Sequence, residues 1–345
     1  MAGSAGRVLL TGANGFIASQ ITSDLIARDY HIIATVRTEA KARQILDRHP
    51  TWKPYITFVY IPDMIVHGAY DEAFKLGGID YIIHNASPVS FAPKDIQEDV
   101  IDPAIEGTMR LIETAHKRGG TKLKRIVLLG SAVSVVNYHE LNKSPDTIYN
   151  EDDWNPTPVA GYCASKVLAE RAAWSFLAAH APSFDLVVLN PAIVTGPMQQ
   201  PVSGPQDINF SIKAMWGYLN KTPENIDDQR PPFVHFVDVR DVSRAHILAL
   251  TTPAASNKRI LLIGGVYTPQ LGLRSLQKQF PELRERLPAG NTEVDAPEGV
   301  HPPHIDTKRS FEIFGEGWGY TDLDTSLGDT VRDLLAWEEK WAGTE

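Results

Sequence analysis

A glycine-rich turn near the start of the chain constrains its fold more than any other feature. The apolar run Val8–Leu10 is followed by T-G-A-N-G-F-I-A, residues 11–18, in which small residues recur at three-residue steps. Gly12 permits a tight turn, Gly15 permits close approach of the backbone to a phosphate, and Ala18 lets a helix pack closely on the strand. The free N–H groups at the start of such a helix bind phosphate. An ordinary glycine-rich turn would share this composition, but its position between a buried strand and a helix favours a dinucleotide site.

Short apolar runs alternate with segments of helical periodicity through the first half of the 345-residue chain. The apolar runs predict strands over Val8–Leu10, His31–Val36, Ile56–Val59, Tyr81–His84, Arg125–Leu129 and Leu186–Leu189. The periodic segments predict helices over Gln20–Arg28, Thr38–Arg48, Asp95–Arg118 and Tyr162–His180. Strands joined by helices form a parallel sheet, and continuous apolar runs indicate burial on both faces. The predicted fold class is therefore α/β, with a Rossmann-type doubly wound parallel sheet.

The character of the sequence changes after Pro191, where proline-rich loops such as P-V-S-G-P and R-P-P-F appear. A helical run over Val239–Leu250 and a strand over Ile260–Ile263 then restore the earlier pattern. We interpret this return as part of the sheet domain. The expected domains are a nucleotide-binding domain of residues 1–194 and 233–265, and a smaller discontinuous C-terminal substrate lobe of residues 195–232 and 266–345.

Composition narrows the range of partners. The net charge of -9 gives no electrostatic reason to expect nucleic acid or an anionic membrane as a partner. The single cysteine, Cys163, excludes an internal disulfide and fits a reducing compartment. The longest apolar stretch, Ile126–Val136, is too short to span a bilayer, and the amino terminus carries no apolar signal segment. We therefore expect a cytoplasmic protein with a small-molecule partner.

The residue that distinguishes NAD from NADP is expected about twenty residues after the turn. An acid at that position accepts the ribose 2'-hydroxyl of NAD, whereas a cation accommodates the 2'-phosphate of NADP. The second predicted strand ends in V-R-T-E-A-K, with Arg37 and Lys41 four residues apart. A helix that begins at Thr38 would direct both cations to one phosphate. Asp29 precedes the strand and cannot serve as the acid. The alternative is a pair of solvated surface cations, and the context favours a 2'-phosphate site.

A second motif, G-Y-C-A-S-K, brings Tyr162 and Lys166 to one face of a helix. A carbonyl that receives hydride also needs a proton, and a phenol with a pKa of ~10 donates poorly at neutral pH unless its anion is stabilised. The Lys166 ammonium would stabilise that anion. Ser131, after the strand R-I-V-L-L-G, would donate a hydrogen bond to the carbonyl. By spacing alone the tyrosine and lysine are a common surface pair, but the serine and the glycine turn ahead of them favour catalysis.

Seven motifs stand in a fixed order along the chain, T-G-A-N-G-F-I-A, V-R-T-E-A-K, D-M, G-S-A-V-S-V, Y-C-A-S-K, L-N-P-A-I-V-T-G-P and F-V-D-V-R-D-V-S-R-A-H. This order resembles the extended short-chain dehydrogenase/reductases. Within them it is most similar to the dihydroflavonol-reductase-like branch, particularly fungal NADPH-dependent methylglyoxal, aldehyde and ketone reductases. The resemblance covers nearly the whole chain and is most specific up to about Ala245.

The resemblance implies NADPH as the cofactor, with Ser131, Tyr162 and Lys166 as catalytic residues. The last two would also contact the cofactor. The resemblance also implies that the pyrophosphate contacts Gly12, Gly15, Phe16 and Ile17, and that the 2'-phosphate contacts Arg37 and Lys41. The adenine would contact Asp63 and Met64, and the nicotinamide ribose would contact Ala86. The carboxamide would contact Pro191 and Val194, and a further phosphate would contact Ser211. One position departs from the family, because Arg110 stands where many members have an asparagine that relays protons. Water near Lys166 could replace that relay.

The function that these residues indicate is reduction of an aldehyde or ketone by NADPH. A sugar epimerase or dehydratase that retains NAD is a second hypothesis, which Arg37 and the lack of an acid after Ser131 disfavour. A non-catalytic NADP-sensing regulator is a third, although such proteins often lack the tyrosine–lysine pair. Family geometry would line the substrate pocket with apolar side chains, which favour a neutral carbonyl over a sugar nucleotide. These are Val89, Phe91, Val133, Ile193 and Trp216.

Other polar or sulfur-bearing residues are expected to have no chemical role. His301, His304 and Asp306, in H-P-P-H-I-D, have a spacing that could suggest a metal, but the two prolines favour a rigid loop. Cys163 has no histidine paired with it in sequence, which favours inert packing. His246 lies in the apolar helical run R-A-H-I-L-A-L and is expected to pack in it. We therefore expect no metal site.

Overall fold

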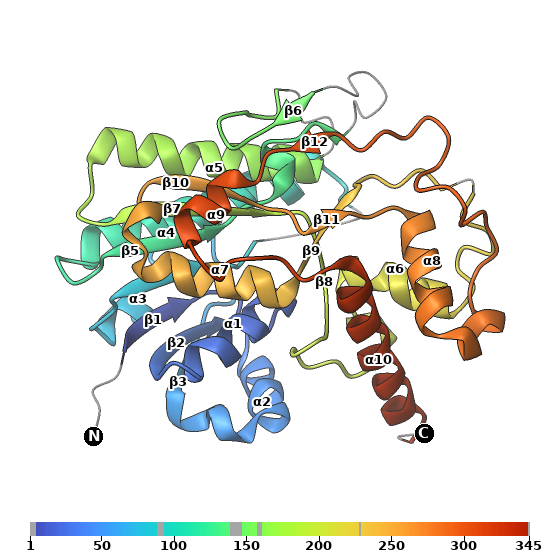
Figure 1. The fold of residues 1–345 in the computed structure, drawn as a ribbon. Helices are drawn as coiled ribbons and strands as arrows, with labels where there is room; N and C mark the ends of the chain where they lie inside the picture. Colours follow the sequence, from blue (N-terminus) through green and yellow to red (C-terminus); the bar gives the residue numbers. More distant parts are fainter. Residues whose placement is uncertain (1–4, 88–92, 139–146, 157–160, 228, 344–345) are drawn as a thin grey trace.

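The computed structural model describes residues 5–87, 93–138, 147–156, 161–227 and 229–343. Within these residues seven parallel strands form one sheet in the order β10-β7-β5-β4-β1-β2-β3 (Figure 1). The strands are β1 (Gly6–Leu10), β2 (Tyr30–Val36), β3 (Ile56–Tyr60), β4 (Tyr81–His84), β5 (Arg125–Leu129), β7 (Asp185–Pro191) and β10 (Lys258–Leu262). The strand order reverses beside β1, which is the doubly wound topology, so the predicted Rossmann-type fold is confirmed.

Helices cover both faces of this sheet, which explains why its central strands are apolar throughout. On one face, Leu10 packs in a cluster with Ile21 and Val239; on the other, Leu9 packs in a cluster with Leu111. Each fully buried side chain of this kind contributes about 1.5 to 3 kcal/mol. The first face is covered by α1 (Phe16–Ile26), α2 (Glu39–Arg48) and α7 (Val239–Thr251). The second is covered by α3 (Asp71–Lys75), α4 (Asp102–Arg118) and α5 (Gly161–His180).

Two helices begin several residues away from their predicted starts. The helix α1 begins at Phe16 instead of Gln20, because Gly15 is extended and serves as the N-cap directly after the turn. The helix predicted from Asp95 is divided into a π-helical turn, η2 (Gln97–Ile101), and α4. Pro103 lies in the first turn of α4 and has no N–H to donate, so the regular hydrogen-bond pattern starts afresh there.

A small second sheet lies beyond the carboxyl end of the main one. It contains β8 (Ile193–Thr195), β9 (His235–Asp238) and β11 (Gly265–Val266), in the order β11-β9-β8. The strand β9 runs parallel to β8 and antiparallel to β11. The sequence did not predict these strands, because runs of two to four residues carry too little periodicity to distinguish strand from loop.

The C-terminal helices gather at one end of the molecule (Figure 1), where α10 (Leu323–Ala342) contacts α6 (Phe210–Leu219) and α8 (Pro269–Gln279). The helix α9 (Lys308–Phe314) lies instead against β10 and α7. Two short strands, β6 (Ile148–Tyr149) and β12 (His304–Ile305), pair with each other. The 3-10 turns within the described residues are η1 (Pro50–Tyr55), η3 (Ala132–Ser134), η5 (Pro205–Asp207), η6 (Pro253–Ala255) and η7 (Pro281–Arg286).

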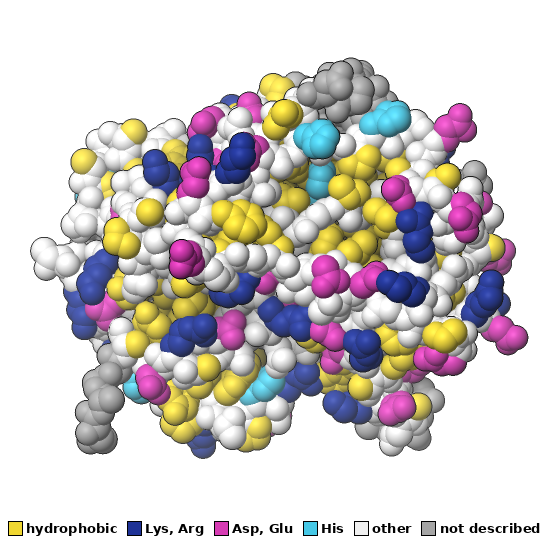
Figure 2. Space-filling model, viewed as in Figure 1, with side chains coloured by type: hydrophobic (Ala, Val, Ile, Leu, Met, Phe, Trp, Pro, Cys, Tyr) yellow, Lys and Arg dark blue, Asp and Glu magenta, His cyan; other side chains and the backbone are white. Residues whose placement is uncertain are grey.

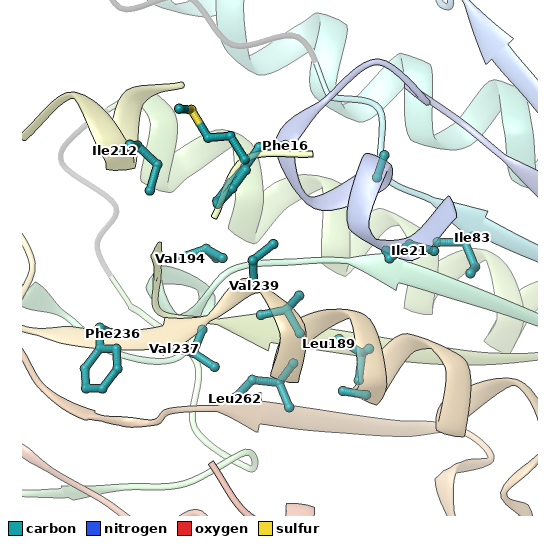
Figure 3. Close-up of a cluster of buried hydrophobic side chains, with 14 of the residues drawn as sticks. Phe16, Ile21, Ile83, Leu189, Val194, Ile212, Phe236, Val237, Val239 and Leu262 are labelled. Carbon is teal, nitrogen blue, oxygen red and sulfur yellow. The ribbon is translucent and has the colours of Figure 1, made fainter. Parts of the chain in front are cut away.

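One hydrophobic cluster continues from the sheet into these C-terminal helices. Figure 3 shows Phe16 of α1, Val194 of β8, Ile212 of α6 and Val239 of α7 within it. Trp337 of α10 is buried in the same cluster. The glycine turn is therefore packed directly against the C-terminal half of the chain.

Charged side chains of both signs are interspersed over the face shown in Figure 2, with hydrophobic side chains between them. Among the described helices, none combines the length and the apolar character needed to cross a membrane.

Candidate active site

A cavity of about 490 Å³ lies at the carboxyl ends of the central strands. This is where ligands bind in open α/β sheets. The predicted site residues that line it come from five separate segments of the chain. They are Gly12, Gly15, Phe16, Ile17, Ser131, Val133, Tyr162, Lys166, Pro191, Ile193, Val194 and Ser211.

The glycine turn has the geometry that a dinucleotide phosphate requires. Gly12 has a φ of 67°, and a Cβ at this position would lie 3.1 Å from the Cα of Ala86. Gly15 caps α1 without a side chain, and the first helical hydrogen bond runs from Ser19 N to Gly15 O. The N–H groups of Phe16, Ile17 and Ala18, ahead of Ser19, therefore have no helical partner and are available to an anion. These features fit a bound pyrophosphate.

Tyr162 and Lys166 lie one turn apart at the start of α5, facing the cavity. The Tyr162 phenol forms a side-chain hydrogen bond with Ser131, and burial, the larger effect, raises its pKa above the ordinary value. The Lys166 Nζ is 5.9 Å from the centroid of the Tyr162 ring. Burial lowers the pKa of Lys166 to about 8. The group thus combines a protonated phenol, a hydroxyl bonded to it and a lysine whose proton is easily exchanged near neutral pH.

Asn190, a residue that the sequence analysis did not single out, fixes the position of Ser131. Asn190 is fully buried on β7, and its Oδ1 accepts a hydrogen bond of 2.8 Å from the Ser131 backbone N. A side chain on Gly130 would collide with this same oxygen, so glycine is required there. The signal in the sequence was a polar residue at the end of the otherwise apolar run L-V-V-L.

A second buried network joins the glycine turn to the end of β4. The Thr11 hydroxyl lies 2.8 Å from Nδ1 of His84 and accepts hydrogen bonds from the backbone N of Asn85 and of Ala86, at 3.0 and 2.9 Å. Ala86, the predicted ribose contact, is thereby held beside Gly12. The sequence analysis did not single out His84.

Arg37 and Lys41 lie at the start of α2, directly after β2. Thr38 is the N-cap of this helix, and its hydroxyl accepts a hydrogen bond from Lys41 N at 3.4 Å. Both cationic side chains are exposed, and neither has a hydrogen bond or ion pair with any residue that the structure describes. Exposed, unpaired cations beside a helix N-terminus fit a phosphate group.

The predicted adenine residues lie in the loop after β3 and do not line the described cavity. Asp63 is exposed, and its Oδ1 accepts a hydrogen bond from Ile65 N at 3.0 Å. Met64 packs on Gly107 of α4, where a Cβ would collide with it. Arg110 donates its Nε–H to Ile65 O at 3.0 Å, and its guanidinium pairs with Glu113. The side chain of Arg110 is therefore held by the backbone of this loop and by Glu113.

The predicted substrate residues have three different outcomes. Val133 and Ile193 line the cavity. Val89 and Phe91 lie outside the described residues. Trp216 does not line the described cavity, because it stands more than a turn beyond the start of α6 and its ring packs 5.5 Å from that of Trp341.

Three aromatic side chains that the sequence analysis missed contribute to the cavity wall. Tyr138 and Phe233 meet edge to face with ring centroids 5.5 Å apart, and the Tyr138 hydroxyl lies 3.3 Å from Nδ1 of His235. Phe210, at the start of α6, is 52% exposed at the cavity. These residues come from segments far apart in the sequence, so no local motif marks them.

The residues expected to be inert lie outside the cavity. Cys163 is buried, free and has its pKa raised by burial. His246 is fully buried on α7 with its Nδ1 2.8 Å from Val242 O. His304 belongs to β12. Within the described part of the chain, no group of three or more His, Cys, Asp or Glu side chains could hold a metal ion.

Comparison with known proteins identifies the family. The NAD dependent epimerase/dehydratase family matches residues 8–264, and the chain belongs to it. The protein is 35% identical to the ketoreductase azaE of Aspergillus niger, over 97% of this chain and 99% of that relative. It is 30% identical to an NADPH-dependent methylglyoxal reductase of Saccharomyces cerevisiae, over 96% and 98% of the two chains. The predicted resemblance to extended short-chain dehydrogenase/reductases and fungal NADPH-dependent reductases is confirmed.

The same relationship appears among solved structures. The crystal structure of yeast methylglyoxal/isovaleraldehyde reductase complexed with NADPH matches with a TM-score of 0.85 and 27% identity. The match covers 96% of this chain and 99% of the yeast protein. The similarity therefore includes the C-terminal half as well as the sheet.

Proposed function

We propose that this protein is an NADPH-dependent carbonyl reductase that converts an aldehyde or ketone to an alcohol. The observation that carries the proposal is the hydrogen-bonded pair of Ser131 and Tyr162 beside Lys166, in the same cavity that the glycine turn lines. A carbonyl group in this cavity would have a hydrogen-bond donor and a proton source within reach. The relatives, which include a ketoreductase and an NADPH-dependent reductase, support this activity.

In this mechanism Tyr162 is the general acid. Burial keeps its phenol protonated at neutral pH, so the proton is held until negative charge develops on the carbonyl oxygen. Ser131 bonds to Tyr162 in the substrate-free protein and donates a hydrogen bond to the carbonyl oxygen when substrate is present. The Lys166 ammonium stabilises the tyrosinate that remains after proton transfer. NADPH supplies the hydride when it is bound.

We propose that the cofactor contacts are those that the resemblance implied. The free N–H groups of α1 would hold the pyrophosphate, and Arg37 and Lys41 would pair with the 2'-phosphate. The position of Ala86 against Gly12 supports its contact with the nicotinamide ribose. The remaining contacts are Asp63 and Met64 with adenine, Pro191 and Val194 with the carboxamide, and Ser211 with a phosphate.

The substrate we propose is a neutral carbonyl compound with an apolar or aromatic group. The cavity wall presents mainly apolar surface, which comes from Val133, Ile193, Tyr138, Phe210 and Phe233. A sugar nucleotide carries several hydroxyl groups that such a wall would leave without hydrogen bonds, at about 1 to 3 kcal/mol each. The lobe that binds it would comprise residues 195–232 and 266–345. We also propose a cytoplasmic location, because the one cysteine is free.

The test is NADPH consumption by the purified protein with a panel of small aldehydes, ketoesters and bulky aromatic ketones. We expect turnover of at least one apolar carbonyl compound, a much weaker reaction with NADH, and none with UDP-sugars. If a UDP-sugar were converted without net loss of NADPH, the protein would be an epimerase. If the protein bound NADPH but reduced no carbonyl compound, the sensing hypothesis would replace the present one.

A further inference from the structure

A buried hydrogen-bond network around Arg259 connects the elements that carry the catalytic residues. Arg259 is the second residue of β10, its side chain is buried, and its Cζ lies 3.7 Å from the centroid of the Trp154 ring. An arginine side chain presents its N–H donors in one rigid plane. At Arg259 five hydrogen bonds use these donors, and the acceptors belong to three separate segments of the chain.

The first of these segments is α5, which carries Tyr162 and Lys166. The Arg259 Nε–H donates to Oε1 of Glu170 at 2.6 Å, and Nη2 donates to Oε2 of the same carboxylate at 3.4 Å. Glu170 lies two turns after Tyr162 and one turn after Lys166, and its side chain is 1% exposed. This bidentate ion pair therefore fixes α5 against β10 at the turn that follows the lysine.

The other acceptors are backbone carbonyl oxygens of two further segments. Nη1 of Arg259 donates to Glu151 O at 2.8 Å and to Asp153 O at 2.6 Å, in the segment that follows β6. Nη2 donates to Ser134 O at 3.5 Å, in the turn η3 that follows Ser131. One arginine side chain thus contacts both the element that places the catalytic serine and the element that places the catalytic tyrosine and lysine.

Asn155 completes the connection between the segment after β6 and the turn η3. Its backbone N donates to Ser134 O at 2.9 Å, and its Nδ2 donates to Val133 O at 2.9 Å and to Val136 O at 3.3 Å. Ser131 is the N-cap of η3, and its hydroxyl accepts a hydrogen bond from Val133 N at 3.4 Å. The position of the serine hydroxyl therefore follows the position of this turn.

We propose that Arg259 is a positioning residue that sets the distance between the Ser131 hydroxyl and the Tyr162 phenol. The proposal rests on the function proposed above. Both hydroxyl groups must reach one carbonyl oxygen, and a misplacement of about 1 Å in such an arrangement can lower the rate ~10²-fold. Arg259 is not one of the described residues that line the cavity, so it acts only through the elements that it joins.

Arg125 offers a matched control within the same sheet. Like Arg259 it is buried, and it forms a bidentate ion pair with Asp185, with N–O distances of 2.5 and 2.7 Å. It also donates to two backbone carbonyl oxygens at the end of α7. Arg125 is the first residue of β5, whereas Ser131 follows the opposite end of that strand. The two arginines therefore have similar partners but lie at different distances from the catalytic group along the sheet.

The first test compares Arg259→Met with Arg125→Met. Each substitution leaves a largely buried carboxylate without its partner, so both should lower the Tm. Only Arg259→Met should lower kcat, by roughly 10- to 100-fold, with little change in the KM for NADPH or for the carbonyl substrate. Equal kcat values in the two variants would overturn the proposal.

The second test separates stability from position with the double variant Arg259→Met and Glu170→Met. Replacement of a buried ion pair by apolar side chains of similar size is often neutral or stabilising, so the Tm should recover much of the loss seen in Arg259→Met. We expect kcat to stay low, because α5 and the segment after β6 no longer share a partner. Recovery of kcat together with the Tm would mean that Arg259 only stabilises the fold, and the proposal would be wrong. If Arg259→Met does not fold, the kcat of the double variant against that of the wild-type protein decides in the same way.

A third measurement does not depend on turnover. In ¹³C spectra of protein labelled at tyrosine Cζ, the signal that disappears in Tyr162→Phe belongs to Tyr162, and its shift reports the hydrogen bond between this phenol and Ser131. The signal should move in Arg259→Met and stay in place in Arg125→Met. A signal that stays in place in both variants would overturn the proposal. If the wild-type protein reduced no carbonyl compound while the signal moved as expected, the proposed function would fail and the positioning by Arg259 would stand.

Discussion

The two ends of the cavity are held in different ways. At the catalytic end, Ser131 is fixed by Asn190, and the glycine turn is fixed by Thr11, through hydrogen bonds buried within the sheet. At the mouth, Phe210 is 52% exposed and Phe233 is half-buried next to the exposed Pro232. The catalytic end is positioned by buried directional bonds, whereas the mouth presents more exposed aromatic side chains.

This difference indicates that chemistry and specificity rest on separate elements. Directional bonds from neighbouring strands hold reacting groups to within a fraction of an ångström, as a proton transfer requires. Apolar walls carried by α6 and by the loop before β9 can change shape without disturbing those bonds. Substitutions at the catalytic end should therefore affect kcat, and substitutions at the mouth should affect KM and the choice of substrate.

The largest effect is expected for Tyr162→Phe, which keeps the ring and its packing but removes the proton donor. Reduction should fall by ~10² to 10⁴-fold, with NADPH affinity little changed. Lys166→Ala should lower turnover and NADPH affinity together, since we propose that it serves both. Steady-state kinetics and NADPH fluorescence titration separate the two effects. Near-wild-type turnover in Tyr162→Phe would show that the proton comes from another group.

Arg37→Ala tests whether an exposed residue affects NADPH-dependent reduction as strongly as the buried catalytic residues do. Loss of a charge-assisted contact should raise the KM for NADPH by roughly 10- to 100-fold and leave the KM for NADH unchanged. Arg43→Ala is the matched control, because Arg43 is exposed on the same helix and pairs with Glu39 at 2.6 Å. An unchanged preference for NADPH in Arg37→Ala would remove Arg37 from the 2'-phosphate site.

The main sheet could be predicted from the sequence because its strands are marked locally. Runs such as Val8–Leu10 are apolar throughout, and that character follows from burial on both faces. The small sheet could not be predicted, because β8, β9 and β11 are defined by pairing between residues 29 to 43 positions apart instead of by their own composition. The π-helical turn before α4 likewise depends on Pro103 and on packing that a periodicity cannot reveal.

The candidate site divides in the same way. The glycine turn, Tyr162 and Lys166 lie in contiguous motifs, and the order of these motifs, with Ser131 between them, was enough to select them. Asn190 could not be selected, because its role exists only when β7 lies beside β5. Trp216 was predicted at the substrate pocket from family geometry, but α6 turns its ring to Trp341. Residue roles that depend on contacts between distant segments need the structure.

Asn190→Ala sharpens the comparison because it alters a bond without touching a reacting group. The Ser131 N–H would lose its buried acceptor, at about 1 to 3 kcal/mol, and the serine would lose its fixed position. We expect kcat to fall roughly 10-fold with little change in KM. Asn190→Asp, which keeps an acceptor oxygen in its protonated form, should retain more activity. If Asn190→Ala altered KM alone, the catalytic end would not depend on this bond.

The smallest effect is expected at the mouth, for Phe210→Ala. A fully buried phenylalanine contributes about 1.5 to 3 kcal/mol, and a half-exposed one about 1 kcal/mol or less. The KM for a bulky aromatic ketone should therefore rise by about 5-fold, whereas kcat and the KM for a small aldehyde stay the same. Phe311→Ala is the matched control, since Phe311 is 43% exposed on α9 and does not line the cavity. Measurement of kcat and KM for both substrates in the two variants shows whether Phe210 affects only the binding of the bulky substrate. An equal loss of kcat for both substrates in Phe210→Ala would mean that the mouth and the catalytic end are coupled, and the separation argued above would fail.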